Sequence, residues 1–469
     1  MAGRILVLAA VLVALLSGPA AAQFSPEREA LNYSKTAERA REYNTPEYRA
    51  ELARRSIDNH REALEIRMTD PERSFTGNVC AGGGDGCAGD VRLYDWEANG
   101  HGIVRPVLYT ARNGATISGH VWATRSGPAT RPGIVITNGS VQAPEQLYWF
   151  AATTLAKRGY VVLTHDPQGQ GRSDTHGEGV DRNEGFPAQA GRPFYDGTED
   201  ALDFFLSTPE RPYTPRPSCT TGTDHSPKQD RRVAAGLNAG HNPLWELLDP
   251  ERIGVAGHSF GASGVTFVGQ ADPRVDAIVA WDNLQTPTSA RSVPDCPSAP
   301  GTRVPPPITK PALGMAADYF LVPTPFTSAP DPDEKSAASL EYSRAGVDTG
   351  QINIRGGTHY EFSYIPNPAF GATLRGMDLV AWYTAAWFDK YVEGDPSADA
   401  RLTTDRWRAD APGAEVDPEG DGNLFSFYYR SRLDMESFGC EDLRSGECGL
   451  RPDGEPVPYS YLAEALSSD

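Results

Sequence analysis

A serine that could act as a nucleophile lies in the pentapeptide Gly257-His-Ser-Phe-Gly261, which has the pattern G-x-S-x-G. Residues 252–256 before it form a short apolar run that predicts a buried strand, and residues 262–268 after it predict a helix. A serine on so sharp a turn has a strained backbone, and only glycine at the flanking positions lets strand and helix approach. The turn would lift the Ser259 hydroxyl clear of the sheet. The context therefore predicts a nucleophile elbow.

The elements around this turn alternate between strands and helices. Residues 104–111 and 115–124 are strand-like and are joined by Asn113-Gly114, a strong hairpin signal. A hairpin followed by alternating strands and helices predicts an α/β fold with a mostly parallel central sheet. The predicted later strands are residues 133–137, 160–166, 275–281, 312–316 and 351–355, and the predicted helices are residues 144–157, 195–207 and 374–392.

Long insertions and two terminal extensions surround these elements. In residues 25–73, which are rich in Glu, Arg and Ala, Ser25 and Thr45 each precede a Pro-Glu pair and predict helix starts. We expect two or three amphipathic helices there and a polar C-terminal extension with an aromatic patch at residues 425–429. Loops as long as the Pro/Gly-rich insertions usually line a functional face, and these insertions are residues 169–193, 209–242, 284–309 and 323–335.

The first residues predict export. Arg4 provides a positive charge, residues 5–16 are apolar, and Ala20-Ala21-Ala22 is a small-residue cleavage site, so residues 1–22 are interpreted as a signal peptide. An N-terminal membrane anchor is the alternative, but the apolar run is short for a membrane span. We therefore expect a secreted protein, extracellular or periplasmic.

Charge and length limit the partners. The chain has 469 residues and a net charge of −19, so its surface is expected to be acidic. An acidic surface disfavours nucleic acid and anionic membranes as partners. After the N-terminus, no apolar stretch in the sequence approaches the length of a membrane span. The sequence does not indicate an oligomeric state.

The six cysteines predict disulfide bonds if the protein is exported. A zinc site is the alternative, but neither a C-x-x-C pair nor a nearby histidine pair supports it. Proximity in the sequence pairs Cys80 with Cys87 and Cys440 with Cys448, which leaves Cys219 with Cys296.

Four motifs resemble those of α/β-hydrolases, and within them those of dienelactone hydrolases and bacterial cutinase-like secreted serine esterases. They are Gly257-His-Ser-Phe-Gly261, Lys310-Pro-Ala-Leu-Gly-Met-Ala-Ala-Asp318, Ile354-Arg-Gly-Gly-Thr-His359, and Gly159-Tyr-Val-Val-Leu-Thr-His-Asp166 with Gly169-Gln-Gly-Arg-Ser173 after it. The resemblance covers residues 104–392. It implies an α/β-hydrolase catalytic domain at residues 96–395, between a helical extension at residues 23–95 and a C-terminal extension at residues 396–469.

In the family that the chain resembles, the nucleophile is followed in the chain first by an acid and then by a histidine. His359 is the single histidine after Ser259 in the sequence, so it is the predicted base. Asp318, after the strand at residues 312–316, is the predicted acid, because the family places its acid there. Asp282 ends the preceding strand and is the alternative acid. Otherwise it is interpreted as a loop-capping carboxylate, as is Asp166.

The resemblance also implies an oxyanion hole, which needs two amides aimed at one point. The Phe260 amide follows the nucleophile and is the first predicted donor. The second is the Ser140 amide, in the turn Asn138-Gly-Ser that follows the strand at residues 133–137. The family more often has His-Gly-Gly or Pro-Gly-aromatic at this turn, so the sequence departs from the family pattern there.

These residues predict a secreted serine hydrolase that cleaves small or polymeric carboxylic esters through an acyl-enzyme, without a metal or organic cofactor. A peptidase or amidase of the same fold is one alternative, and a non-catalytic binding protein is another. Residues 417–422, Asp-Pro-Glu-Gly-Asp-Gly, superficially resemble a calcium loop. The twelfth position is Tyr428 rather than Glu, which disfavours an EF-hand and leaves open a calcium-stabilised surface loop.

Overall fold

The computed structural model describes residues 24–39, 45–74, 88–141, 143–186, 188–322, 325–365, 371–404, 406 and 424–445. The predicted signal peptide, the Cys80–Cys87 pair and the calcium-like loop at residues 417–422 lie outside these residues. Within them, no helix is long and apolar enough to cross a membrane.

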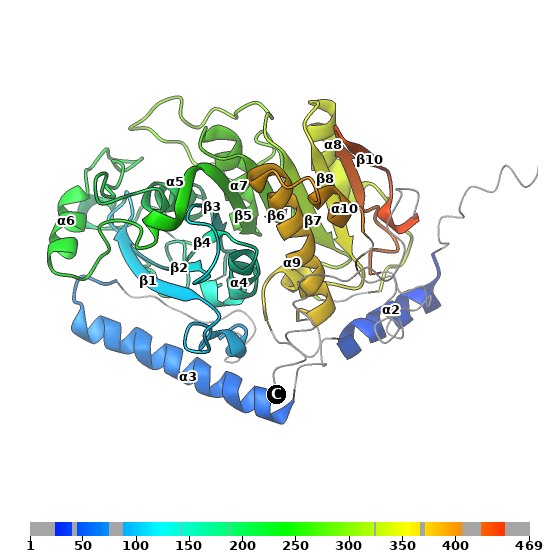
Figure 1. Ribbon diagram of the computed structural model, residues 1–469, viewed down its shortest axis with the longest axis horizontal. Helices are drawn as coiled ribbons and strands as arrows, with labels where there is room; N and C mark the ends of the chain where they lie inside the picture. The colour runs from blue at the N-terminus through cyan, green and yellow to red at the C-terminus, as the bar shows by residue number, and fades with distance from the viewer. Residues whose placement is uncertain are drawn as a thin grey trace, which may run out of the picture.

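The protein has an α/β fold built on one ten-stranded mixed sheet with helices on its two faces (Figure 1). The strands lie in the order β1-β2-β4-β3-β5-β6-β7-β8-β9-β10. The six strands from β4 to β8 in this order are parallel, and the pairs at the two edges are antiparallel. The strands are β1 (Ile103–Thr110), β2 (Thr116–Ala123), β3 (Arg131–Thr137), β4 (Val161–His165), β5 (Leu248–His258), β6 (Ala277–Trp281), β7 (Ala312–Ala317), β8 (Thr349–Ile354), β9 (Arg432–Met435) and β10 (Phe438–Cys440).

Two hydrophobic cores fill the space between the sheet and its helices. Helices α4 (Trp149–Lys157) and α9 (Leu374–Phe388) contribute to the core on one face. Helices α5 (Arg192–Phe205), α7 (Phe260–Ala271) and α8 (Ala337–Arg344) contribute to the core on the other. Because both faces are covered, every residue of β3, β4, β6, β7 and β8 is buried. This explains why these strands appear in the sequence as short apolar runs rather than as alternating patterns.

The predicted hairpin and the predicted parallel strands are confirmed. β1 pairs antiparallel with β2, and Gly114 in the connecting turn has a φ of 84°, which glycine adopts without strain. The carboxyl ends of the parallel strands lie side by side: Thr137 is paired with Gly257, His258 with Trp281, and Ala317 with Ile354. The loops that leave these carboxyl ends carry the candidate site residues.

The extensions contain more regular structure than the sequence indicated. The expected N-terminal helices are confirmed as α2 (Pro26–Arg39) and α3 (Pro46–Thr69), and Thr45 caps α3 by accepting a hydrogen bond from the Tyr48 amide. The C-terminal extension supplies β9 and β10, which continue the sheet beyond β8. The insertions and the C-terminal part also contain the short helices α6 (Ser226–Ala234) and α10 (Ala398–Leu402).

The Cys219–Cys296 disulfide is present, as predicted. It joins the insertion before β5 to the insertion after β6, and both cysteines are buried. Cys440 is also disulfide-bonded, and its predicted partner Cys448 lies outside the described residues.

Candidate active site

Ser259 lies on a strained turn between β5 and α7, with φ 57° and ψ −119°. Any larger residue at the flanking glycines would clash with the backbone. A Cβ on Gly257 would lie 2.4 Å from the Gly261 carbonyl oxygen. A Cβ on Gly261 would lie 2.2 Å from the carbonyl oxygen of Thr137, at the end of β3. The Ser259 amide donates to the Trp281 carbonyl at 2.9 Å, which fixes the turn against β6. The sharp strand-to-helix turn predicted from the sequence is therefore present.

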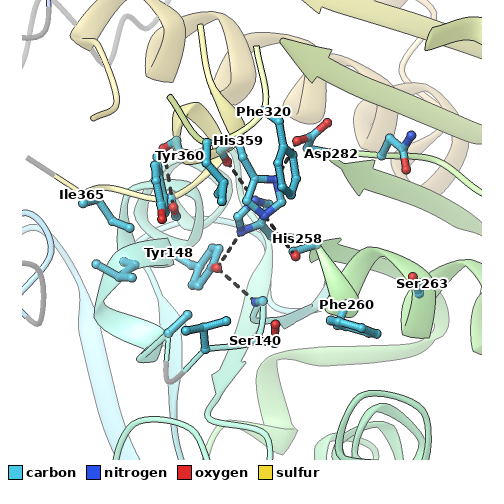
Figure 2. A pocket seen from close by; sticks show the side chains of 18 of the residues that line it. Ser140, Tyr148, His258, Phe260, Ser263, Asp282, Phe320, His359, Tyr360 and Ile365 are labelled. Atoms are coloured by element: carbon cyan, nitrogen blue, oxygen red, sulfur yellow. Dashed lines mark hydrogen bonds and ion pairs between the residues drawn. The ribbon is translucent and has the colours of Figure 1, made fainter. Parts of the chain in front are cut away.

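The imidazole of His359 lies between Ser259 and a carboxylate (Figure 2). Its Nε2 is 3.0 Å from Ser259 Oγ, and its Nδ1 is 2.6 Å from Asp282 Oδ2. An ionised carboxylate can only accept, so Nδ1 carries the proton and Nε2 is free to accept from the serine hydroxyl. The His359 amide donates to the Phe320 carbonyl at 2.5 Å, which ties its loop to the loop after β7.

The prediction that Asp318 contacts His359 is wrong. The side chain of Asp318 is buried, and its Oδ2 accepts hydrogen bonds from the Gly356 amide at 2.7 Å and from Asn32 at 3.4 Å. Its other oxygen accepts a hydrogen bond from Ser426, and burial raises the pKa of the carboxyl group. Asp318 therefore fixes the start of the loop that leads to His359.

Asp282 occupies the position beside His359 because of the strand order. β6, which precedes Asp282, is the direct neighbour of β5 and hence of Ser259, whereas Asp318 follows β7, one strand further away. The alternative interpretation of Asp282 as a loop-capping carboxylate is not what the structure shows. For Asp166 the loop-capping interpretation is confirmed, since its carboxylate accepts from the Glu145 amide at 2.7 Å and the Arg172 amide at 2.8 Å.

Two of the amides in the turn after β3 already have hydrogen-bond acceptors. Its Gly139 amide donates to the Tyr148 hydroxyl at 3.0 Å, and its Val141 amide donates to Gln189 Oε1 at 2.7 Å. Among the residues that the structure describes, the Ser140 and Phe260 amides have no hydrogen-bond acceptor, and both residues line the pocket that contains Ser259. These are the two amides that the sequence predicted as oxyanion donors.

Asp166 also fixes this turn. Its Oδ1 accepts a hydrogen bond from the Asn138 side chain at 3.1 Å, and Asn138 donates in addition to the Ala143 carbonyl at 3.1 Å. Both Asp166 and Asn138 are fully buried. Burial raises the pKa of Asp166, and the neighbouring Glu145 carboxylate raises it further.

Two residues that sequence reasoning missed, His258 and Tyr148, lie next to the candidate triad. His258 Nδ1 is 2.8 Å from the Tyr148 hydroxyl, and its Nε2 is 3.0 Å from the His359 carbonyl oxygen. Figure 2 shows Tyr148, His258 and His359 in a row along one side of the pocket. Burial lowers the pKa of His258 well below its usual value, and the nearby His359 lowers it further, so His258 is neutral. His258 could have been noticed as the residue before the serine; nothing in the sequence points to Tyr148.

The site opens into a cavity of about 490 Å³. Phe320 packs against His359 with ring centroids 5.0 Å apart, yet the residue is 63% exposed, which places it at the mouth. Arg291 and Lys335 also line the cavity. Much of the remaining wall is apolar and consists of Val141, Leu147, Leu321 and Ile365.

The described residues contain no group of three or more His, Cys, Asp or Glu side chains arranged to hold a metal ion. No protein-family model matches the chain, and no curated protein matches it. Any assignment of function therefore rests on the chemistry of the site itself.

Proposed function

We propose that the protein is a secreted serine hydrolase of the α/β-hydrolase fold that cleaves carboxylic esters. The observation that carries the proposal is the position of the His359 imidazole, within hydrogen-bond distance of Ser259 Oγ on one side and of Asp282 Oδ2 on the other. A nucleophile, a base and an orienting carboxylate in this arrangement are the recurring machinery of acyl transfer. The strained turn and the two unoccupied amides add to this support.

Each residue has a defined role in the proposed reaction. Ser259 Oγ attacks the ester carbonyl carbon while His359 Nε2 takes the hydroxyl proton, and Asp282 stabilises the imidazolium that forms. The Phe260 and Ser140 amides donate to the oxyanion of the tetrahedral intermediate. His359 then gives the proton to the leaving alcohol, and an acyl-enzyme remains on Ser259. Water activated by His359 attacks that acyl group and releases the acid.

The cavity favours an ester with an apolar portion. Part of its wall is formed by apolar side chains, and its volume of about 490 Å³ lies within the range of sites for small organic ligands. The exposed Phe320 at the mouth extends the apolar surface outward, so the substrate can be longer than the cavity. We infer that the cavity holds the acyl or alcohol group next to the reacting carbonyl.

The proposal is tested with a panel of esters of graded acyl length that includes an aromatic diester. Wild type and Ser259→Ala are assayed in parallel, together with an aminoacyl anilide that reports amidase activity. We expect ester turnover that disappears in Ser259→Ala. Equal turnover by the two proteins would contradict the proposal, and turnover of the anilide alone would replace the esterase with an amidase.

A further inference from the structure

We infer that Tyr148 and His258 are positioning residues that fix the base His359, the nucleophile Ser259 and the oxyanion turn after β3 relative to one another. The inference rests on the proposed function. The chain of hydrogen bonds runs from the Gly139 amide to the Tyr148 hydroxyl, from that hydroxyl to His258 Nδ1, and from His258 Nε2 to the His359 carbonyl. Gly139 and Tyr148 are nine residues apart, whereas 110 residues separate Tyr148 from His258 and 101 separate His258 from His359.

Each proton in this chain has one consistent place. The His359 carbonyl can only accept, so His258 Nε2 must carry the proton that it donates. A neutral imidazole with its proton on Nε2 has a lone pair on Nδ1, which accepts the Tyr148 hydroxyl proton. The hydroxyl oxygen in turn accepts from the Gly139 amide. Burial keeps His258 neutral, which preserves this direction of donation.

This chain of hydrogen bonds fixes the backbone of the base, His359. His258 immediately precedes Ser259, so its bond to the His359 carbonyl ties the backbone of the base to the turn of the nucleophile. The two imidazole rings also pack together, with centroids 4.5 Å apart. The distance of 3.0 Å between His359 Nε2 and Ser259 Oγ therefore depends on His258 as well as on Asp282.

The chain has a second consequence, for the oxyanion turn. The Tyr148 hydroxyl engages the Gly139 amide, so this amide is not available to an oxyanion. With the Gly139 peptide held in this direction, the next amide, that of Ser140, remains as the turn's donor toward the pocket. Without the hydroxyl, the Gly139 amide loses its acceptor, and the orientation of the neighbouring Ser140 amide then depends only on the contacts of Asn138 and Val141.

The first test is Tyr148→Phe, which keeps the ring stacked on Trp281 and removes the hydroxyl alone. Because a small misplacement of catalytic groups costs up to about 10²-fold, we expect kcat to fall by about 10-fold to 10²-fold with little change in KM. The matched control is Tyr160→Phe. Tyr160 is also fully buried and donates to Asp389 at 2.8 Å. It lies just before the amino end of β4, whereas the site lies at the carboxyl ends of the parallel strands. We expect the control to lower Tm and leave kcat unchanged.

The second test separates the two bonds of His258. Gln at position 258 can place an amide N–H near the position of Nε2 and keep the bond to the His359 carbonyl, whereas Leu keeps neither bond. We expect His258→Leu to lower kcat by about 10²-fold and His258→Gln to recover about tenfold of that loss, as for one buried hydrogen bond. If His258 had only a structural role, kcat of the two variants would change in proportion to their Tm, whether or not the bond to the His359 carbonyl is kept.

An activity-independent measurement separates this inference from the proposed function. Hydrogen–deuterium exchange of the Gly139 amide, which donates to the Tyr148 hydroxyl, should be slow in wild type and in Tyr160→Phe, and faster in Tyr148→Phe. The Ser140 amide should exchange fast in all three proteins. If wild type shows no Ser259-dependent turnover, the proposed function fails, whatever the exchange shows. If wild type is active and Tyr148→Phe retains its kcat within about twofold or changes KM alone, the positioning role is overturned. Unchanged exchange in Tyr148→Phe would also overturn it.

Discussion

Asp282 Oδ2 lies 2.6 Å from His359 Nδ1, although 77 residues separate the two in the chain. The contact arises because β6, which ends before Asp282, is the direct neighbour of the strand that carries Ser259. Asp318 is instead surrounded by Gly356, Asn32 and Ser426. The two carboxylates therefore have different roles, one toward the imidazole and one toward the loop that carries it.

The first prediction concerns these two carboxylates. Asp282→Asn should lower kcat by about 10⁴, because an amide cannot hold the imidazole in the required tautomer or stabilise its charged form. Asp318→Asn should lower the free energy of unfolding by about 1–3 kcal/mol, the cost of disturbing a buried hydrogen-bonded group, with a far smaller effect on kcat. Both are measured at saturating ester, with circular dichroism as the folding control. A dead Asp318→Asn beside an active Asp282→Asn would contradict the assignment.

The second prediction concerns acid sensitivity. Burial lowers the pKa of His165 from its ordinary value of 6.5 to about 4. Between these pH values the unfolded chain binds a proton at this residue that the folded protein does not, so stability falls as the pH falls from 6.5 toward 4. Wild type should lose about 2–3 kcal/mol more than His165→Gln between pH 7.5 and pH 4.5, where Gln keeps a donor for Thr137 but does not titrate.

This acid sensitivity is measured by urea unfolding of both proteins at the two pH values. His258 titrates in the same direction, but it is present in both proteins and cancels in the difference. Equal losses of stability in wild type and His165→Gln would show that His165 does not contribute.

The third prediction concerns the Cys219–Cys296 disulfide, which closes a loop of 77 residues. Opening it should lower the free energy of unfolding by about 4 kcal/mol, because the unfolded chain gains the conformational freedom that the loop removes. The Cys219→Ser, Cys296→Ser double variant is compared with wild type in urea under oxidising conditions. The same comparison under reducing conditions, where the Cys219–Cys296 bond is open in both proteins, provides the control for effects of the serines themselves. An unchanged midpoint of unfolding would contradict the prediction.

The strands of the sheet could be predicted from the sequence because their fully buried residues appear as short apolar runs between glycines and prolines. The last two strands, β9 and β10, could not, since β9 has four residues that alternate charged with apolar side chains and β10 has only three residues. The sharp turn at Ser259 was predictable because the steric demand for Gly257 and Gly261 is local.

The acid could not be chosen from the sequence, because the choice depends on which strand lies next to β5. Strand order is decided by the packing of the whole sheet, and both Asp282 and Asp318 follow apolar strands. The contact between Tyr148 and His258 joins residues that are 110 positions apart. The pentapeptide draws attention to His258, but nothing in the predicted helix at residues 144–157 indicates Tyr148. The oxyanion turn was placed by resemblance, and its Ser140 amide lines the pocket.

The central claim is that Ser259 is a nucleophile activated by His359 and Asp282. It is tested most directly by treating the protein with a fluorophosphonate probe, measuring the intact mass over time, and mapping the modified peptide. We predict one adduct, located on Ser259, that is absent in Ser259→Ala and forms orders of magnitude more slowly in folded His359→Ala and Asp282→Asn. A wild-type protein that stays unlabelled, or a Ser259→Ala variant that labels at the wild-type rate, would contradict the account.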